Sequence, residues 1–312
     1  MRDTASSPLD VVAHAAHTID QGSSSFAAAA RLFDETTRQS TMMLYAWCRH
    51  CDDVIDGQVL GHDQRNGSRQ DGASCLNELE ASTRRACAGN PPDEPAFVCL
   101  SEVVQRHEID VELALAHLAG FRMDVEGARY ETLGDTLLYC YRVAGVVGLM
   151  MARIMGARDR ATLDRACDLG MAFQLTNIAR DIVEDAAIGR VYLPAEWLRA
   201  KGIPPDELEH PAHREALAEL AAELVETAEP YYRSARQGIA ALPFRSAWSV
   251  ATARDVYRAI GRQVKAKGSH AWDARVSTTK AQKLWYAVRG AGVAVSSRAL
   301  PWTRREPSLW HP

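Results

Sequence analysis

Two short acidic clusters, 125 residues apart, restrict the possible folds of this chain more than any other feature. The first lies in RHCDDVIDGQ and contains Asp52, Asp53 and Asp56; the second lies in QLTNIARDIVED and contains Asn177, Asp181, Glu184 and Asp185. Apolar residues flank both clusters at helical spacing, which distinguishes them from solvated surface runs of charge. Because like charges one helical turn apart destabilise an isolated helix, each cluster calls for a compensating partner.

Helical geometry places the polar residues around each cluster on one face of its helix. One stripe consists of Tyr45, Arg49, Asp52 and Asp56, and the other of Gln174, Asn177, Asp181 and Asp185. Hard oxygen ligands in clusters, with no histidine or cysteine among them, favour Mg²⁺ or Mn²⁺. Two such helices facing each other across a cavity would hold metal ions that bridge the leaving group of a diphosphate ester. The alternative is a solvated helix face on which aspartates cluster by chance.

Helical periodicity runs through nearly the whole chain, and the alternation typical of strands is nearly absent. The pattern predicts helices over residues 8–20, 25–33, 36–56, 74–88, 96–106, 110–126, 131–156, 159–186, 194–200, 211–240, 243–266 and 278–290. Turn-rich segments at 61–72, 88–95 and 201–207 separate some of them. Since no linker divides the chain, we expect a single all-α domain over residues 1–298 and an irregular C-terminal tail over residues 299–312.

Composition excludes several classes of function. The chain has 312 residues, a hydrophobic content of 47% and a charged content of 24%, which are typical of a soluble globular protein. A formal net charge of −4, without a Lys/Arg-rich run, argues against nucleic-acid binding. The seven cysteines form no paired motif beyond the CxxC-like spacing of Cys48 and Cys51, so reduced core thiols are expected. The N-terminus lacks an apolar segment typical of a signal peptide, and we expect a cytoplasmic protein.

The most apolar stretch, residues 143–152, lies between Arg142 and Arg153. It is too short to span a bilayer. A helix that is apolar all round is either a central core helix or the wall of an apolar cavity. Its residues Val143, Val147, Gly148, Met150 and Met151, together with Ala172, are candidates for the lining of such a cavity, although ordinary core packing has the same spacing.

The two motifs in their full context resemble a known family. DDVID preceded by YAWCRHC, together with QLTNIARDIVEDAAIGRVYLPAEWL, is similar to the squalene and phytoene synthases, the head-to-head trans-isoprenyl diphosphate synthases. The resemblance extends from GSSSF at 22–26 to residues 252–268 and is strongest to the bacterial phytoene synthases. Chain-elongating enzymes carry a second DDxxD, and class I cyclases an Asn-xxx-Ser/Thr-xxx-Glu pattern, where this chain has Asn177-xxx-Asp181-xxx-Asp185. The resemblance implies the isoprenoid synthase helical fold with a central apolar cavity.

The family resemblance also implies a reaction. The expected activity is the condensation of two geranylgeranyl diphosphates into phytoene through a cyclopropylcarbinyl diphosphate, which is the first committed step of carotenoid biosynthesis. The implied ligands of two or three Mg²⁺ or Mn²⁺ ions are Asp52, Asp56, Asn177, Asp181 and Asp185. The residues expected to be catalytic are Tyr45, Arg49, Asp52, Asp56, Asp181 and Asp185. Asp53 and Glu184 are expected to lie behind the metal ligands or to pair with arginine.

A further set of residues is implied to bind substrate, namely Ser23, Ser24, Ser25, Tyr45, Arg49, Gln174, Arg180, Tyr257 and Arg275. Simpler roles remain open for several of them. Arg49 could only balance the carboxylates, and Arg180 could be an intrahelical partner of Glu184. Tyr257 could be a plain core tyrosine, and the serines an ordinary N-cap. Ser24 stands where the family often has a lysine, which removes one charged contact to diphosphate.

Alternatives remain within and outside the family. Squalene or dehydrosqualene synthases use farnesyl diphosphate, and tail length depends on the side chains that close the cavity. A helical lipid-binding protein that kept only the fold is the non-enzymatic alternative. Because the product is strongly apolar, we also expect peripheral membrane contact, alongside the enzymes upstream and downstream in carotenoid synthesis. The candidate contact residues, which could instead pack on the core or lie in a disordered tail, are Trp285, Val293, Val295, Leu300, Trp302 and Trp310.

Overall fold

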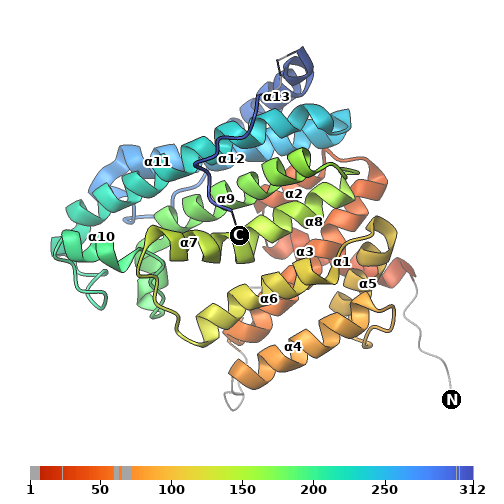
Figure 1. Cartoon of the computed structure of the whole chain (residues 1–312), viewed down its shortest axis with the longest axis horizontal. Coiled ribbons are helices and arrows are strands. Elements are labelled where there is room, and N and C mark those ends of the chain that lie inside the picture. The colour runs from red at the N-terminus through yellow and green to blue at the C-terminus, as the bar shows by residue number, and fades with distance from the viewer. Residues whose placement is uncertain are drawn as a thin grey trace.

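A bundle of helices makes up nearly all of the part of the chain that the structure describes (Figure 1). The computed structural model describes residues 8–22, 24–59, 63–64, 72–299, 301 and 303–311. The N-terminal half contains α1 (Pro8–Gly22), α2 (Ser24–Ala30), α3 (Glu35–Asp56), α4 (Gly72–Cys87), α5 (Pro95–His107), α6 (Val111–Val125), α7 (Leu133–Cys140) and α8 (Val146–Ile154). The C-terminal half contains α9 (Arg160–Ala187), α10 (Ala195–Ala200), α11 (Arg214–Gly238), α12 (Phe244–Lys267) and α13 (Lys280–Ser296). The prediction of an all-α fold is confirmed.

Local sequence signals explain where the two acidic helices begin and end. Asp34 caps α3 by accepting a hydrogen bond from the Thr37 backbone N–H at 2.9 Å, and Asp159 caps α9 in the same way through Thr162. Helix α3 ends at Gly57, whose φ of 64° is a left-handed conformation that favours glycine. These boundaries leave Asp52 and Asp56 in the last two turns of α3.

Two predicted boundaries differ from the structure in an informative way. The single helix expected over 131–156 is interrupted by a π-helical turn, η1 (Tyr141–Gly145), between α7 and α8. There the backbones of α8 and α9 approach closely, since a Cβ at Gly148 would lie 2.3 Å from the Ala166 carbonyl oxygen. π-Turns inside helices often occur beside functional sites. The last helix extends to Ser296 because Val293 and Ala294, beyond the expected end, are buried.

Short elements complete the chain. The turn-rich segment after α3 contains a two-stranded antiparallel pair that the sequence did not predict, β1 (Gln58–Val59) and β2 (Asp63–Gln64), with Gln58 opposite Gln64. Single 3₁₀ turns are η2 (Pro211–His213), η3 (Ile239–Ala241), η4 (Gly268–His270) and η5 (Ser297–Ala299). The predicted start of a helix at 211 is therefore a 3₁₀ turn, with α11 following it. The described residues after η5 form no helix.

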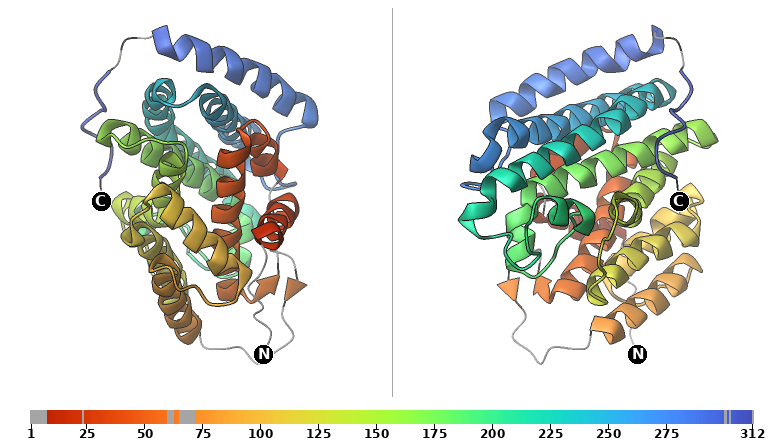
Figure 2. Two further views of the ribbon diagram at one scale, coloured as in Figure 1. Left: turned by 90° about the vertical axis from the view of Figure 1, so that its right-hand side faces the viewer. Right: turned by 60° about the vertical axis from the view of Figure 1, so that its left-hand side comes forward.

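Helix α9 lies at the centre of the bundle, where α8, η1, α11 and α12 pack around it (Figure 2). Its apolar side chains, such as Leu175 and Ile178, belong to a core shared with α11 and α12. A second core lies among α3, α5, α6 and α8, around Trp47 and Leu100. The stretch Leu133–Ile154 has a mean hydropathy of 1.4 and satisfies the length and composition of a membrane span, but α6 and α9 pack along it as along a core helix. A cavity between the two cores therefore has α3 and α9 in its walls.

Helix α13 lies on the outer side of α12 (Figure 2) and carries an exposed apolar stripe. The stripe consists of Leu284, Trp285, Val288 and Val295, whose residues are between 62% and 69% exposed. Among the expected membrane-contact residues, Trp285 and Val295 are thus exposed. Val293 is not, because it faces the core formed with α12. Trp310 is half-buried and packs against Tyr141, and Leu300 and Trp302 lie outside the described residues.

Candidate active site

The two acidic helices border one cavity. It encloses about 330 Å³ and is lined mainly by apolar side chains. Tyr45 and Cys48 of α3 lie on one wall, Gln174 and Asn177 of α9 on the other, and Tyr257 of α12 closes a third side. The predicted polar stripes therefore meet at one end of an apolar cavity, beside the carboxylates that continue each stripe.

The first carboxylate cluster is partly neutralised by arginine. Arg49 contacts Asp52 through Nη1 at 3.1 Å and Asp53 through Nε at 3.0 Å. Burial, together with the neighbouring charge of Asp56, raises the pKa of Asp52 to about 6. Asp53 pairs with arginine, as expected. In this structure Arg49 balances the carboxylates of its own helix.

Arg190 joins the ends of the two helices. This residue follows α9, and its guanidinium contacts the carboxylate of Asp56 on α3. Behind it lies Asp124 on α6, which accepts hydrogen bonds from the Tyr192 hydroxyl at 3.0 Å and the Tyr139 hydroxyl at 3.2 Å. Burial raises the pKa of Asp124 to about 6. None of these residues was predicted from the sequence, where the one available signal is the position of Arg190 directly after the second acidic motif.

The second cluster has a different pattern of partners. Arg180 donates from Nε to the Asp181 carboxylate at 2.7 Å, so the alternative pairing of Arg180 with Glu184 is wrong. Arg275 donates to Asp181 at 3.0 Å and also contacts Glu184. Asp181 is thus held by two arginines, and Glu184 pairs with one of them, as expected. The predicted substrate-binding arginines are paired with carboxylates of the two acidic clusters.

Other polar atoms of this cluster lack such partners. The Asn177 side-chain oxygen is buried and has no hydrogen-bond partner among the described residues, while the Asn177 amide nitrogen lies 3.4 Å from the Gln174 oxygen. Burial and the nearby charge of Asp181 raise the pKa of Asp185 to about 7. A buried acceptor without a donor and a carboxylate that resists ionisation are both suited to binding a cation.

The donor set fits a divalent metal that brings further ligands with it. Among the residues the structure describes, no three His, Cys, Asp or Glu side chains converge on one point. Mg²⁺ characteristically takes one or two carboxylates and completes its octahedral shell with water and substrate phosphate oxygens. Asp52 and Asp56 on one side, with Asn177 and Asp185 on the other, present the hard oxygen donors that such ions use.

Two tyrosines lie at the junction between the polar and apolar parts of the cavity. Burial raises the pKa of Tyr45 to about 12, so its hydroxyl remains protonated. Gly22 leaves room for it, since a Cβ there would lie 2.3 Å from the Tyr45 hydroxyl oxygen. Tyr257 stacks on Phe173 with ring centroids 4.2 Å apart, and burial raises its pKa as well. Tyr257 is both buried and part of the cavity wall.

Some predicted positions lie elsewhere. Val143, Val147, Gly148 and Met151 line the cavity, but Met150 and Ala172 do not, because both are fully buried on faces that pack into the cores. Ser24 and Ser25 begin α2, and nothing is described of their side chains; Ser23 lies outside the described residues. His50 contacts the ring of Phe97 in an edge-to-face arrangement and lies away from the cavity lining.

Comparison with known proteins agrees with this geometry. A sequence profile of the squalene/phytoene synthase family matches residues 19–282. The chain is 55% identical to a 15-cis-phytoene synthase of Pantoea ananas, over 95% of this chain and 96% of the relative. It is 56% identical to one of Enterobacter agglomerans, over 94% of this chain and 99% of the relative.

Solved structures show the same fold. A dehydrosqualene synthase crystallised with a ligand superposes with a TM-score of 0.82 at 27% identity, covering 92% of this chain and 98% of that one. A squalene synthase of Alicyclobacillus acidocaldarius, at 23% identity, superposes with a TM-score of 0.71 over 84% of this chain and 97% of that one. The chain therefore belongs to the squalene/phytoene synthase family of prenyltransferases, within which its similarity is to the bacterial phytoene synthases.

Proposed function

We propose that this enzyme condenses two molecules of geranylgeranyl diphosphate head to head into phytoene, through a cyclopropylcarbinyl diphosphate. The observation that carries the proposal is an apolar cavity lined by Cys48 of α3 and Asn177 of α9, each one helical turn before the first carboxylate of an acidic stripe, Asp52 or Asp181. The high identity to curated phytoene synthases supports the C20 substrate over its C15 counterpart. Enzymes that supply the C20 diphosphate and consume the C40 hydrocarbon are its natural partners.

The metal ligands in this proposal are Asp52 and Asp56 from α3 with Asn177, Asp181 and Asp185 from α9. Two or three Mg²⁺ or Mn²⁺ ions held there would neutralise the charge that develops on the departing diphosphate. The raised pKa values of Asp52 and Asp185 support the assignment, because carboxylates held near other carboxylates favour a bound cation. The unpartnered Asn177 oxygen supports it in the same way.

The arginines have a second role in this proposal. Arg49, Arg180 and Arg275 neutralise carboxylates in the structure described here. When cations occupy the carboxylates, these guanidiniums become free to donate to diphosphate oxygens, for which their planar, bidentate geometry is suited. Tyr45 and Gln174 lie between the acidic residues and the cavity, where they orient the first carbons of the substrate. Ser23, Ser24 and Ser25 complete the proposed diphosphate site at the start of α2.

The apolar part of the cavity protects the cationic intermediates. Its wall excludes water, which would otherwise capture an allylic cation as an alcohol. The rings of Tyr257 and Phe173 lie at its polar end, where a π face stabilises positive charge. Loss of a proton, rather than capture by water, then ends the reaction with a conjugated triene.

One assay tests the proposal against its closest alternative. The purified protein is incubated with Mg²⁺ and either C15 or C20 diphosphate, and products are identified by mass. Phytoene from the C20 substrate, with little C30 product from the C15 substrate, is expected. A C30 product formed preferentially would replace the proposed function with dehydrosqualene or squalene synthesis, and no hydrocarbon from either substrate would reject catalysis.

Peripheral membrane contact is the second part of the proposal, for a cytoplasmic protein that releases an apolar product. The exposed stripe of α13 at Leu284, Trp285 and Val288 supports it, because such a face gains free energy by entering the interfacial region of a bilayer. Co-sedimentation with liposomes should fall in the variant Leu284→Ser/Trp285→Ser and depend weakly on salt. Exposed Ile188, which lies after α9, provides the control Ile188→Ser. Equal sedimentation of all three proteins would remove α13 as the contact.

A further inference from the structure

The apolar cavity extends along α9, away from the acidic residues. Asn177 lines its polar end, and Phe173, Gly170 and Ala166 line it at successive turns of the same helix, with Arg165 next to Ala166. Asn177 and Arg165 are twelve residues apart, which corresponds to a rise of about 18 Å along the helix. On α12, Tyr257 and Ser249 follow the same course in the same direction along the chain. The cavity thus has a polar mouth at Asn177, and its far end on α9 is at Arg165 and Thr162.

The closed end contains an unusual residue for an apolar wall. Arg165 is 4% exposed, and the other residues around it include Thr162, Gly238, Ile239 and Leu242. Its Cβ and Cγ lie against Gly238, where an added Cβ would be 2.7 Å from the Arg165 Cβ. The hydrocarbon stem of the arginine therefore forms part of the wall, and the absence of a side chain at residue 238 gives it the space.

The charged head of Arg165 bonds away from the cavity, to groups on α11 and the C-terminal segment. Nη1 donates to the Ser234 hydroxyl at 2.7 Å, and Nη2 donates to the Thr303 carbonyl oxygen at 2.6 Å. An arginine can bury its stem against apolar surface when its head finds such acceptors. Two acceptors thus fix the direction of the stem, and one of them belongs to residues 303–311, hereafter the C-terminal strap.

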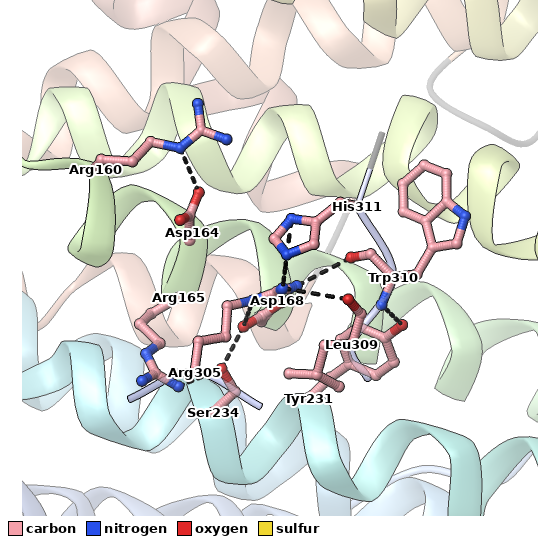
Figure 3. A network of polar contacts seen from close by, with 10 residues as sticks. All are labelled: Arg160, Asp164, Arg165, Asp168, Tyr231, Ser234, Arg305, Leu309, Trp310 and His311. Atoms are coloured by element: carbon pink, nitrogen blue, oxygen red, sulfur yellow. Dashed lines mark hydrogen bonds and ion pairs between the residues drawn. The ribbon is translucent and has the colours of Figure 1, made fainter. Parts of the chain in front are cut away.

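A second arginine fixes the strap itself (Figure 3). Arg305 donates from Nε to Asp168 of α9 at 2.9 Å and from Nη2 at 2.6 Å, and it also bonds the carbonyl oxygens of Leu309 and Trp310. The Trp310 backbone N–H donates to the Tyr231 hydroxyl at 3.2 Å. Ser234 donates to Asp168 as well, so the two arginines belong to one connected network. The strap therefore holds the end of the cavity in place from outside.

We propose that Arg165, held by the strap, is the floor of the cavity and sets the length of prenyl tail that the enzyme accepts. This inference rests on the proposed function. A tail that reaches past the floor must displace the Arg165 stem, and its head would then lose two buried hydrogen bonds. A shorter tail leaves the floor uncovered and loses apolar contact. The floor thus disfavours both longer and shorter prenyl tails.

The test compares C25 with C20 diphosphate in competition, using the full-length enzyme. Arg165→Ala removes the stem and should raise the ratio of kcat/KM for C25 over C20 by roughly tenfold or more, in line with the discrimination that hydrophobic pockets achieve. Arg165→Met is the matched control, because it keeps an unbranched stem of similar length without the charged head. Its ratio should rise less than that of Arg165→Ala, because a stem still closes the end of the cavity but has lost the two hydrogen bonds that held it.

Further variants keep the test decisive. If Arg165→Ala fails to fold, Arg165→Val shortens the stem less and should give a smaller change in the same direction. Arg233→Ala loses the 3.6 Å contact of another arginine with Glu306 of the strap, outside the cavity, and should leave the ratio unchanged. A wild-type enzyme that makes C40 hydrocarbon, together with unchanged ratios in Arg165→Ala and Arg165→Val, would overturn the floor and leave the proposed function intact. A wild-type enzyme without C40 product would reject the proposed function instead.

Discussion

Helix α9 carries a fully buried carboxylate, Asp168, and a half-buried one, Asp185, and their surroundings differ. Asp168, in the first half, is fully buried and receives hydrogen bonds from Arg305 and Ser234. Asp185, in the last turn, makes no side-chain hydrogen bond or ion pair within the described part of the chain, and burial raises its pKa to about 7. A carboxylate whose oxygens are all satisfied stabilises the fold, whereas one left without donors is available to a ligand.

The cavity mouth and the strap differ in the same respect, namely in how their charged groups are paired. At the mouth, Asp181 shares its charge with Arg180 and Arg275, two residues suited to a second anion. In the strap, Arg305 has carbonyl oxygens as additional acceptors, so its donors are used within the protein. We infer that the charged side chains at the mouth change partners during turnover, whereas those of the strap keep theirs.

Chelation should separate the two regions most sharply. EDTA is expected to abolish turnover, because every proposed ligand is an oxygen donor that leaves the metal when a stronger chelator competes. Added Mg²⁺ or Mn²⁺ should restore it. The melting temperature without metal should remain well defined, since the strap network contains no metal ligand. Turnover that survives exhaustive chelation would contradict the proposed mechanism.

The effect of a single substitution on α9 should depend on whether the residue lies at the cavity mouth or beside the strap. Asp185→Asn is expected to lower kcat by roughly 10²- to 10³-fold, the scale on which removal of one electrostatic group acts in other enzymes. The melting temperature of the metal-free protein should stay constant or rise, because a carboxylate that is costly to ionise has been removed. Rate assays and thermal melts of the same preparation measure both quantities. Near-normal turnover would show that the second cluster is only a helix face.

Removing Arg305, which anchors the strap, should instead affect stability more than turnover. Arg305→Ala leaves the fully buried Asp168 without its cationic partner, which should cost about 3–5 kcal/mol in the free energy of unfolding. Denaturant titration measures this loss. The double variant Arg305→Ala/Asp168→Ala should recover part of it, because no unpaired charge then remains. A loss below about 1 kcal/mol in Arg305→Ala would instead place the pair among weak surface ion pairs.

The smallest expected effect is on pH dependence. The folded-state pKa values of Asp52 and Asp185, about 6 and about 7, lie above the ordinary value of 3.8. The folded metal-free protein therefore binds protons more tightly than the unfolded chain, and these two groups lower its stability as pH rises from about 4 to about 7. Metal binding requires the ionised forms and should strengthen over the same range.

Thermal melts with and without Mg²⁺ between pH 5 and 8 measure these two opposite pH dependences. The stabilisation by Mg²⁺ should grow with pH, and the growth should be smaller in Asp185→Asn. Asp168→Asn is the matched control on the same helix, where the growth should equal that of the wild type. A stabilisation by Mg²⁺ that is constant across this range would contradict the assignment of the two carboxylates.

Much of the architecture follows from local sequence. The periodicity of α3 and α9 predicted their extents to within two residues, and their capping residues Asp34 and Asp159 are read from the chain itself. The π-turn at η1 was not predicted in this way; it lies where the backbone approaches α9, since a Cβ at Gly170 would be 2.2 Å from the Ala144 carbonyl oxygen. The membrane-contact set was partly wrong for the same reason: Val293 is apolar like its neighbours, and only packing against α12 decides that it is buried.

The sequence by itself determined the all-α class, the two acidic faces and the family, because each depends on residues within a few helical turns of one another. Only the tertiary structure decided which charges are neutralised and where the cavity ends. Arg190 meets Asp56 across 134 positions, and Arg305 meets Asp168 across 137. Such pairs depend on how helices pack, which no local pattern specifies. The same packing turns the stem of Arg165 toward an apolar cavity and its charge toward the strap, a division that the sequence does not reveal.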